Sequence, residues 1–321
     1  MAREGGAERI GVGLVGARGY TGAELVRLVE AHPRFHLTFA VSRQGKGRPL
    51  SELCAGAETE LVVEALEPAE VAARGTEVVI LALPNGQAAP YVAAIEAAGG
   101  RAVIVDLSAD HRFDAEWRYG LPELRREALF GARRIANPGC YATGAQLGIA
   151  PALGVLGGMP HVFGVSGYSG AGTTPSDRND PEKLRDNLMP YALVGHVHER
   201  EIGHGLGVEV AFVPHVAPFF RGITLTIAMP LATTVSADAL RAMYQAAYEG
   251  EALVAVQEEI PLVRDAAGRH GVTIGGITVD AAQRRAVVVV TLDNLLKGAA
   301  TQALQNMNLA FSLPELLGVP R

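Results

Sequence analysis

Short aliphatic runs alternate with helical patterns along the first 140 residues of the chain. Runs that predict buried strands occur at 10–15, 36–41, 77–83 and 101–106. Apolar residues recur at helical spacing between them, at 24–29 and 87–98. Continuous aliphatic strands that alternate with helices are typical of a parallel sheet covered on both faces. The pattern predicts an α/β domain with a Rossmann-like, doubly wound parallel sheet.

The pattern changes after Cys140. A helical stretch to about residue 156 leads into more closely spaced strand-like runs, which lie at 161–165, 208–213, 223–229, 272–279 and 286–292. Period-two alternation within these runs favours a second, α+β domain with a mixed or antiparallel sheet. A last amphipathic helix follows. We expect a first domain, a second domain and a terminal helix that returns to the first, at 1–145, 146–296 and 297–321.

Composition and charge narrow the class of protein. The length of 321 residues suits two domains, and 49 % hydrophobic residues with 38 Gly argue against disorder and collagen. A net charge of −6 gives no basic field for nucleic acid. The first residues lack the apolar stretch of a signal peptide, and no apolar run reaches the roughly 18 residues of a membrane span. We expect a soluble, cytoplasmic protein without nucleic-acid or membrane partners.

A glycine-rich turn joins the first strand to the first helix. Gly13-Leu-Val-Gly16-Ala-Arg-Gly19-Tyr-Thr-Gly22 lets the backbone approach a pyrophosphate at a helix amino terminus. A literal G-x-G-x-x-G also starts at Gly11, but it lies inside the strand. A plain tight turn is the alternative to a dinucleotide site.

The end of the second strand indicates which dinucleotide is bound. An NAD site usually carries Asp or Glu there for the ribose hydroxyls, whereas this chain has Ser42 and Arg43. A guanidinium and a hydroxyl suit a 2′-phosphate. We therefore expect NADP, with an ordinary surface arginine as the alternative.

Cys140 is the candidate nucleophile. It follows Asn-Pro-Gly and opens a helix, where the dipole and free amides lower the pKa of a thiol. A lone cysteine is otherwise a small buried hydrophobe, and we assign that role to Cys54. His215 ends a strand in a prolyl loop and is the candidate acid/base. The two cysteines match no zinc spacing, so we expect no metal.

Several sequence blocks in order resemble those of the N-acetyl-γ-glutamyl-phosphate reductases, within the aspartate-semialdehyde dehydrogenase superfamily. They cover roughly residues 8–312 and read GARGYTGAEL, LPNG, DLSADHR, NPGCYAT, SGYSGAG, PHVAPFFRGI and DNLLKGAATQALQNMN. The resemblance implies an NADPH-dependent oxidoreductase of arginine biosynthesis that assembles as a homodimer or homotetramer.

The resemblance also implies a role for each matching position. Cys140 matches the nucleophile and His215 the acid/base residue. Arg112 and Arg221 are expected to anchor the acyl phosphate and the substrate carboxylate, or to form ion pairs at a domain interface. The residues expected to bind the cofactor are Gly13, Gly16, Arg18, Gly19, Tyr20, Thr21, Gly22, Ser42, Arg43, Pro84, Asn85, Gly86, Ser169, Gly170, Ala171, Gly172 and Asn294.

One block departs from the commonest bacterial pattern. Where many members have His-Arg-His-Thr-Pro-Glu, this chain reads His196-Val-His198-Glu-Arg-Glu201. The block resembles the fungal-type branch, in which the domain is often fused to acetylglutamate kinase, so association with that kinase is expected. His198 and Glu201 are candidate substrate contacts, and a solvated helix start is the alternative.

The implied reaction is the reduction of N-acetyl-γ-glutamyl phosphate to N-acetyl-L-glutamate 5-semialdehyde through a Cys140 thioester, with release of phosphate. Aspartyl phosphate and the longer aminoadipyl phosphate are alternative substrates, because one methylene is worth only about 1–3 kcal/mol of discrimination. An NADP-binding regulator without turnover is the alternative from another class of protein.

Overall fold

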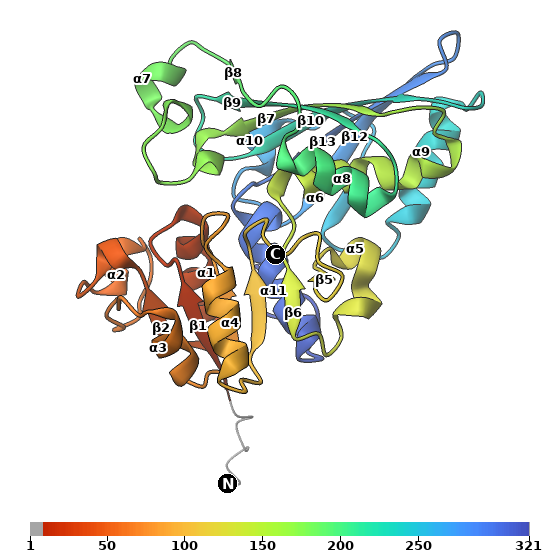
Figure 1. Ribbon diagram of the computed structural model, residues 1–321. Coiled ribbons are helices and arrows are strands. Elements are labelled where there is room, and N and C mark those ends of the chain that lie inside the picture. The colour runs from red at the N-terminus through yellow and green to blue at the C-terminus, as the bar shows by residue number, and fades with distance from the viewer. Residues whose placement is uncertain (1–8, 321) are drawn as a thin grey trace, which may run out of the picture. The chain divides into compact units, whose positions relative to one another are not determined.

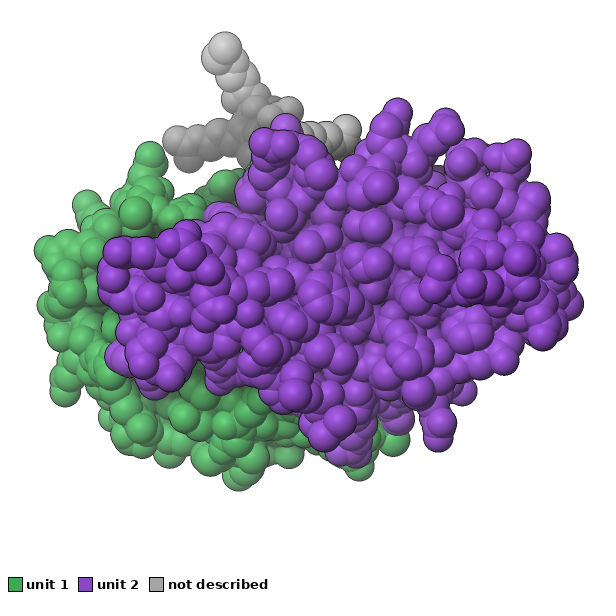
Figure 2. All heavy atoms as spheres, turned by 90° about the horizontal axis from the view of Figure 1, so that it is seen from above, with its two compact units in different colours: residues 1–137, 300–321 green, residues 138–299 purple. Residues whose placement is uncertain are grey.

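The structure is a computed structural model that describes residues 9–320 (Figure 1). It divides into two compact units, coloured separately in Figure 2: one runs to Asn137 and takes up the chain again from Ala300, and the other is Pro138–Ala299. The chain therefore passes into the second unit before Cys140, not near residue 145. The helix that begins at Cys140 belongs to the second unit, because it packs on strands of the second sheet.

The first unit is built on a six-stranded parallel sheet. The strand order is β2-β1-β3-β4-β6-β5, and every neighbouring pair is parallel. The strands are β1 (Ile10–Val15), β2 (Phe35–Val41), β3 (Val78–Leu81), β4 (Val103–Asp106), β5 (Arg118–Tyr119) and β6 (Arg134–Ala136). The predicted doubly wound α/β sheet is confirmed.

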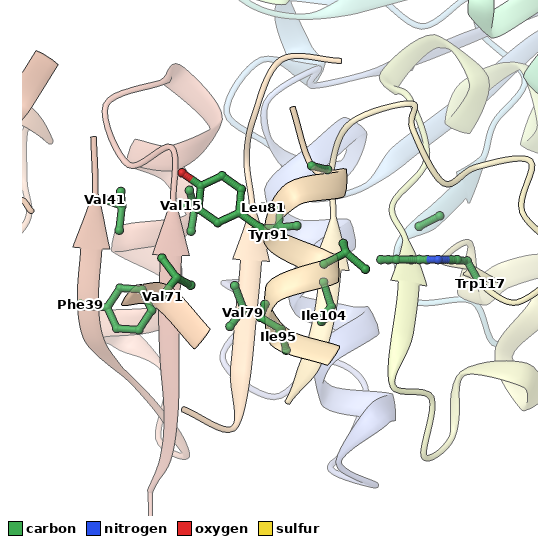
Figure 3. Close-up of a cluster of buried hydrophobic side chains, with 13 residues drawn as sticks. Val15, Phe39, Val41, Val71, Val79, Leu81, Tyr91, Ile95, Ile104 and Trp117 are labelled. Atoms are coloured by element: carbon green, nitrogen blue, oxygen red, sulfur yellow. The ribbon is translucent and has the colours of Figure 1, made fainter. Parts of the chain in front are cut away.

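Helices of the first unit connect these strands. They are α1 (Tyr20–Ala31), η1 (Arg43–Gly45), α2 (Leu50–Leu53), α3 (Pro68–Ala73), α4 (Ala89–Ala97), α5 (Pro122–Arg125), η2 (Arg126–Leu129) and α11 (Thr301–Ala310). Figure 3 shows part of the core, where Tyr91 and Ile95 of α4 pack against Val79 and Leu81 of β3. Each such buried side chain contributes roughly 1.5–3 kcal/mol.

The last helix, α11, belongs to the first unit although it comes from the far end of the chain. All ten of its residues are buried, and it packs on α1 and β4. The Asn308 amide bonds the buried His32 ring at 3.1 Å. Gln302 and Asn306 both donate to the carbonyl of Gly120, at 2.8 and 3.0 Å. These polar contacts fix the rotation of α11 on the sheet.

The second unit is built on a mixed sheet of seven strands in the order β11-β12-β13-β10-β7-β9-β8. Two neighbouring pairs, β11 with β12 and β7 with β9, are parallel. The strands are β7 (His161–Gly167), β8 (Met189–Pro190), β9 (Ala211–Ala217), β10 (Ile223–Pro230), β11 (Val254–Val256), β12 (Val272–Asp280) and β13 (Arg285–Leu292). The predicted mixed sheet is confirmed.

Helices cover one face of this sheet. Figure 1 shows α6 (Cys140–Ile149) and α8 (Val197–Leu206) on that face, where α6 contacts β10 and β13 and α8 contacts β9. The remaining helical segments are η3 (Ala150–Val155), η4 (Tyr168–Ala171), η5 (Asp177–Asn179), α7 (Pro181–Leu184), α9 (Ala237–Ala247), α10 (Val263–Ala266) and the π-helix η6 (Leu296–Ala300). No helix in residues 9–320 is long and apolar enough to cross a membrane.

Candidate active site

The turn between β1 and α1 has the backbone geometry of a phosphate-binding loop. Gly16 adopts a φ of +99°, and a Cβ there would lie 2.1 Å from the carbonyl oxygen of Ala82. A Cβ on Gly22 would lie 2.4 Å from the carbonyl oxygen of Gly16. Only glycine fits at these positions. The turn therefore leads closely into the amino terminus of α1, where backbone amides favour an anion.

The sheet topology places this turn at a switch point. The strand order runs from β1 to β2 on one side and from β1 to β3 on the other, and ligands of open α/β sheets bind at the carboxyl ends of strands at such a point. Gly13 lies inside β1, and a Cβ there would be 2.1 Å from the Phe39 ring. The small size of Gly13 therefore serves the packing of β1 on β2.

The segment after β3 lies on the other side of the switch point. Gly86 has a φ of +82° and donates its N–H to Asp110 at 2.6 Å. Asn85 accepts the N–H of Ala109 at 2.9 Å. These reciprocal bonds hold Pro84–Gly86 as a fixed, exposed turn.

Ser42 and Arg43 lie where β2 ends. Arg43 is exposed, and within residues 9–320 its guanidinium forms no ion pair or hydrogen bond. Exposed Arg18, in the glycine-rich turn, likewise forms none in the described chain. Both cations are thus available to a phosphate. Together with the turn, these residues fit a dinucleotide that carries a 2′-phosphate.

A buried carboxylate positions the start of α6 in the second unit. Gly139 is the N-cap residue of α6 and Cys140 its first residue. The N–H of Gly139 donates to Glu201 Oε1 at 2.8 Å, and Glu201 is only 1 % exposed. Half-buried Cys140 therefore begins a ten-residue helix whose first turn is held by α8.

Two histidines at the start of α8 lie on the same side of the sheet as α6. The His198 ring is 5.8 Å from the Tyr141 ring, and His198 Nε2 is 4.0 Å from Glu201 Oε2. The His196 ring is 4.8 Å from that of His198. His196 Nδ1 accepts the N–H of His198 at 3.1 Å, so His196 caps α8. Burial, aided by the charge of Arg178, lowers the pKa of His196 to about 4, and this histidine is neutral at pH 7.

Two tyrosines adjoin the cysteine. Burial, with the nearby Tyr191 and Cys140, raises the pKa of Tyr141. Burial and then the charge of Cys140 raise the pKa of Tyr191 to about 12. Both phenols therefore stay protonated and can donate hydrogen bonds. The Tyr141 hydroxyl donates to the backbone carbonyl of His215 at 2.8 Å.

The side chain of His215, the acid/base residue expected from the sequence, lies apart from this group. Strand β9 pairs with β7 so that Phe212 lies beside Val162 and His215 beside Val165. Phe212 packs on Tyr141 of α6. Because successive side chains of a strand point to opposite faces, His215 points to the other face. There its ring contacts Phe163 at 4.4 Å.

Neither predicted arginine anchor presents its guanidinium to a substrate in the way the sequence suggested. Arg112 is buried and donates to the carbonyls of Asn137 and Leu107, at 3.0 and 2.9 Å. Arg221 forms a two-point ion pair with fully buried Asp293, at 2.6 and 3.1 Å. Arg112 thus ties two strand ends together. Arg221 neutralises a carboxylate within the second unit.

Two groups of residues that the resemblance assigns to the cofactor, Ser169–Gly172 and Asn294, contact each other. Asn294 Nδ2 donates to Ser169 Oγ at 2.9 Å, and Asn294 Oδ1 accepts the N–H of Gly222 at 2.8 Å. Gly172 has a φ of +77°. The Asn294 amide thereby links η4 to the start of β10. Within residues 9–320 no group of His, Cys, Asp and Glu side chains is arranged to hold a metal.

Sequence reasoning missed Tyr191 and His196. Tyr191 lies in no sequence motif that would have indicated a functional role. The block of His196, His198 and Glu201 did carry a signal, because residues three apart on a helix, such as His198 and Glu201, lie on one face. A further groove, of about 940 Å³, lies at the amino ends of β4 and β6. That edge of the sheet is opposite the switch point, so we assign the groove no part in the site.

Comparisons with known proteins agree with this arrangement. The family described as "Semialdehyde dehydrogenase, NAD binding domain" matches residues 11–132, and "Semialdehyde dehydrogenase, dimerisation domain" matches residues 140–294. Aspartate semialdehyde dehydrogenase II of Vibrio cholerae, solved as a complex with ASA, superposes with a TM-score of 0.78 at 18 % identity over 95 % of this chain and 99 % of that one. The fold is thus that of the semialdehyde dehydrogenases.

Relatives found by sequence similarity indicate which enzyme family of this fold the chain belongs to. The N-acetyl-γ-glutamyl-phosphate reductase of Xanthomonas axonopodis pv. citri (strain 306) is 55 % identical over 308 residues, or 96 % of this chain and 98 % of that protein. The enzyme of the same name from Stenotrophomonas maltophilia (strain R551-3) is 57 % identical over 309 residues, with the same coverage. The chain belongs to the N-acetyl-γ-glutamyl-phosphate reductase family.

Proposed function

We propose that the protein reduces N-acetyl-γ-glutamyl phosphate to N-acetyl-L-glutamate 5-semialdehyde, with NADPH as reductant and release of phosphate, in arginine biosynthesis. The observation that carries this proposal is the identity of 55 % over 96 % of the chain to a reductase of that name. Cys140 at the start of α6, with Glu201 and His198 beside it, supplies the groups that the reaction needs.

Cys140 is the proposed nucleophile. Its sulfur bonds to the acyl carbon, the bond from that carbon to the phosphate oxygen breaks, and phosphate leaves with the electron pair. A thioester on Cys140 results. The backbone amides of the first turn of α6 face the developing oxyanion, an interaction that typically lowers a barrier by about 3 kcal/mol.

NADPH, when bound, supplies the hydride that reduces the thioester. The residues proposed to hold it are Gly16–Gly22, Ser42 and Arg43 in the first unit. The residues proposed to contact the nicotinamide belong to the second unit and are Ser169–Gly172 and Asn294. Pro84, Asn85 and Gly86 complete the nucleotide side.

His198 is the proposed proton donor, in place of His215. Protonated His198 gives its proton to the oxygen of the reduced intermediate, and departure of the aldehyde returns the Cys140 thiolate. The Glu201 carboxylate lies 4.0 Å from Nε2 of the His198 ring and holds the ring beside the start of α6. Neutral His196 fixes the helix start on which His198 lies.

The test is phosphate-dependent oxidation of N-acetyl-L-glutamate 5-semialdehyde, followed by the absorbance of NADPH. Aspartate semialdehyde and the aminoadipate analogue run alongside. We expect Cys140→Ser to abolish turnover, and His198→Asn to lower kcat roughly 100-fold or more. His215→Asn, the matched control, keeps near wild-type kcat. Loss of activity in His215→Asn alone would restore His215 as the acid/base.

We further propose that two copies of the chain pair through the sheet face of the second unit that α6 and α8 do not cover. Phe163 on that face is 43 % exposed, and Val213, Val287 and Val289 are half-buried. The matching family is described as a dimerisation domain. A fungal-type kinship, association with acetylglutamate kinase and a cytoplasmic location stay predictions of the sequence.

A further inference from the structure

A cationic side chain outside the predicted site, that of Arg178, lies beside Tyr191 and its neighbour His196. The Arg178 guanidinium lies over the ring of Tyr191, 4.9 Å from its centroid. The Tyr191 ring is 5.5 Å from the His196 ring, which in turn is 4.8 Å from the ring of His198. Tyr191 thus contacts both the guanidinium and the histidine pair at the start of α8.

Arg178 has no carboxylate partner in the described part of the chain. Within residues 9–320 its guanidinium forms no ion pair or hydrogen bond. The charged neighbours in the same segment are paired elsewhere: Asp177 with Lys183 at 3.8 Å, and Glu182 with Arg185 at 2.6 Å. Arg178 therefore keeps its hydrogen-bond donors available beside a half-buried aromatic surface.

The backbone around Arg178 is fixed. Asn179 Nδ2 donates to the carbonyls of Gly172 and Thr174, at 2.8 and 2.7 Å. The N–H of Ser176 donates to Asn179 Oδ1 at 2.8 Å. The neighbouring residue thereby ties Arg178 to the Ser169–Gly172 segment. A guanidinium held in this way by its backbone and by an aromatic ring loses little entropy when it binds an anion.

We propose that Arg178 binds the α-carboxylate of the substrate. This inference rests on the proposed function, which makes the substrate an acyl phosphate with a second anionic group. The two arginines predicted for that task, Arg112 and Arg221, hold protein partners instead. A planar guanidinium binds a carboxylate through two parallel hydrogen bonds.

The carboxylate suits this position better than the phosphoryl group. The phosphoryl oxygen is bonded to the carbon that Cys140 attacks, whereas three carbons separate that carbon from the α-carboxylate. A series of ring contacts, from Tyr191 to His196 and from His196 to His198, connects Arg178 with the proposed proton donor. The two anions are thus assigned to different ends of the site.

The test measures the reverse reaction, in which the aldehyde and phosphate are separate substrates. Arg178→Gln is expected to lower kcat/KM for N-acetyl-L-glutamate 5-semialdehyde roughly 10- to 100-fold, the range for a hydrogen bond to a charged group, and to leave the KM for phosphate unchanged. With 4-acetamidobutanal, which lacks only the α-carboxylate, the variant and the wild type should agree within about twofold. Arg178→Lys keeps the positive charge but loses the two parallel donors of the guanidinium, so its kcat/KM should fall between those of Arg178→Gln and the wild type.

Arg185→Gln is the matched control, because it removes the same charge from an exposed, ion-paired arginine of the same segment. It should behave as the wild type. A raised KM for phosphate in Arg178→Gln, or equal losses with both aldehydes, would overturn the carboxylate assignment. No activity of the wild type with N-acetyl-L-glutamate 5-semialdehyde would instead overturn the proposed function, and with it the assignment of Arg178 to the carboxylate.

Discussion

Glu201 is a single side chain on which much of the second unit's chemistry depends. It is buried, accepts the N–H of Gly139 and approaches the His198 ring. A buried carboxylate is costly unless it has partners. One partner, Gly139, directly precedes Cys140, and the other, His198, lies in the first turn of α8. One residue thus positions both the proposed nucleophile, Cys140, and the proposed acid, His198.

Arg43 is the residue that we expect to select the cofactor. Arg43→Ala should raise the KM for NADPH roughly 10- to 100-fold, because a charge-assisted contact to the 2′-phosphate is lost. The KM for NADH should change little. Arg48→Ala, which removes an exposed arginine that pairs with Glu52, is the control in the same steady-state assay. Equal losses with both cofactors would show that Arg43 does not contact the phosphate.

For single residues, the sequence predicts which side chains are candidates for chemistry better than it predicts the direction in which they point. The position of Cys140 at the start of a helix was predictable because a Pro-Gly pair followed by a helical pattern is a local feature. The direction of His215 depends on its register with β7, some fifty residues away. Likewise, Arg221 meets Asp293 through folding of distant segments. Arg178 lies in a turn-rich stretch without periodicity, so no local pattern singled it out.

Among the elements, the π-helix η6 packs against the proposed nucleophile, Cys140. A Cβ on Gly298 would lie 2.7 Å from the Cβ of Cys140 and 3.1 Å from the carbonyl oxygen of Asp293. The absence of a side chain therefore lets η6 pack against the start of α6. A single π-helical turn within a helix is frequently found at a functional site.

Gly298→Ala is expected to displace Cys140 and to lower kcat, with a loss of about 1–3 kcal/mol in the free energy of unfolding from overpacking. Urea unfolding and steady-state kinetics measure the two effects. Gly154→Ala is the matched control, since nothing lies within 4 Å of a Cβ at that position. Wild-type kcat and stability in Gly298→Ala would contradict the contact.

The sequence predicted most strands, because aliphatic runs indicate a buried strand without distant information, but among the longer helices only α1, α4, α6 and α11. It missed short β8 and β11, which have two and three residues and too few positions for a period. It began the strand at 208, whereas β9 is Ala211–Ala217. The shift matters because it moves His215 from a loop into the strand, where alternation sets its direction.

For the whole molecule, we expect the assembly to depend on the uncovered sheet face. Phe163→Asp should convert dimers to monomers in sedimentation velocity, because a buried, unpaired carboxylate at an interface is costly. Val194→Asp, at a side chain that is 85 % exposed outside the sheet, should leave the assembly intact. Dimers of unchanged stability in Phe163→Asp would assign pairing to another surface.

The position of α11 in the first unit reverses the order in which the protein is completed during synthesis. The ribosome releases the strands of the nucleotide-binding unit first, yet α1 and β4 lack their packing partner until residues 301–310 emerge. Domains usually fold as units while the chain is made, beginning from the amino terminus. Here the inserted unit, Pro138–Ala299, is complete earlier. A nascent chain stopped before α11 would leave an apolar surface open to chaperones, and the cofactor-binding unit would be the last to close.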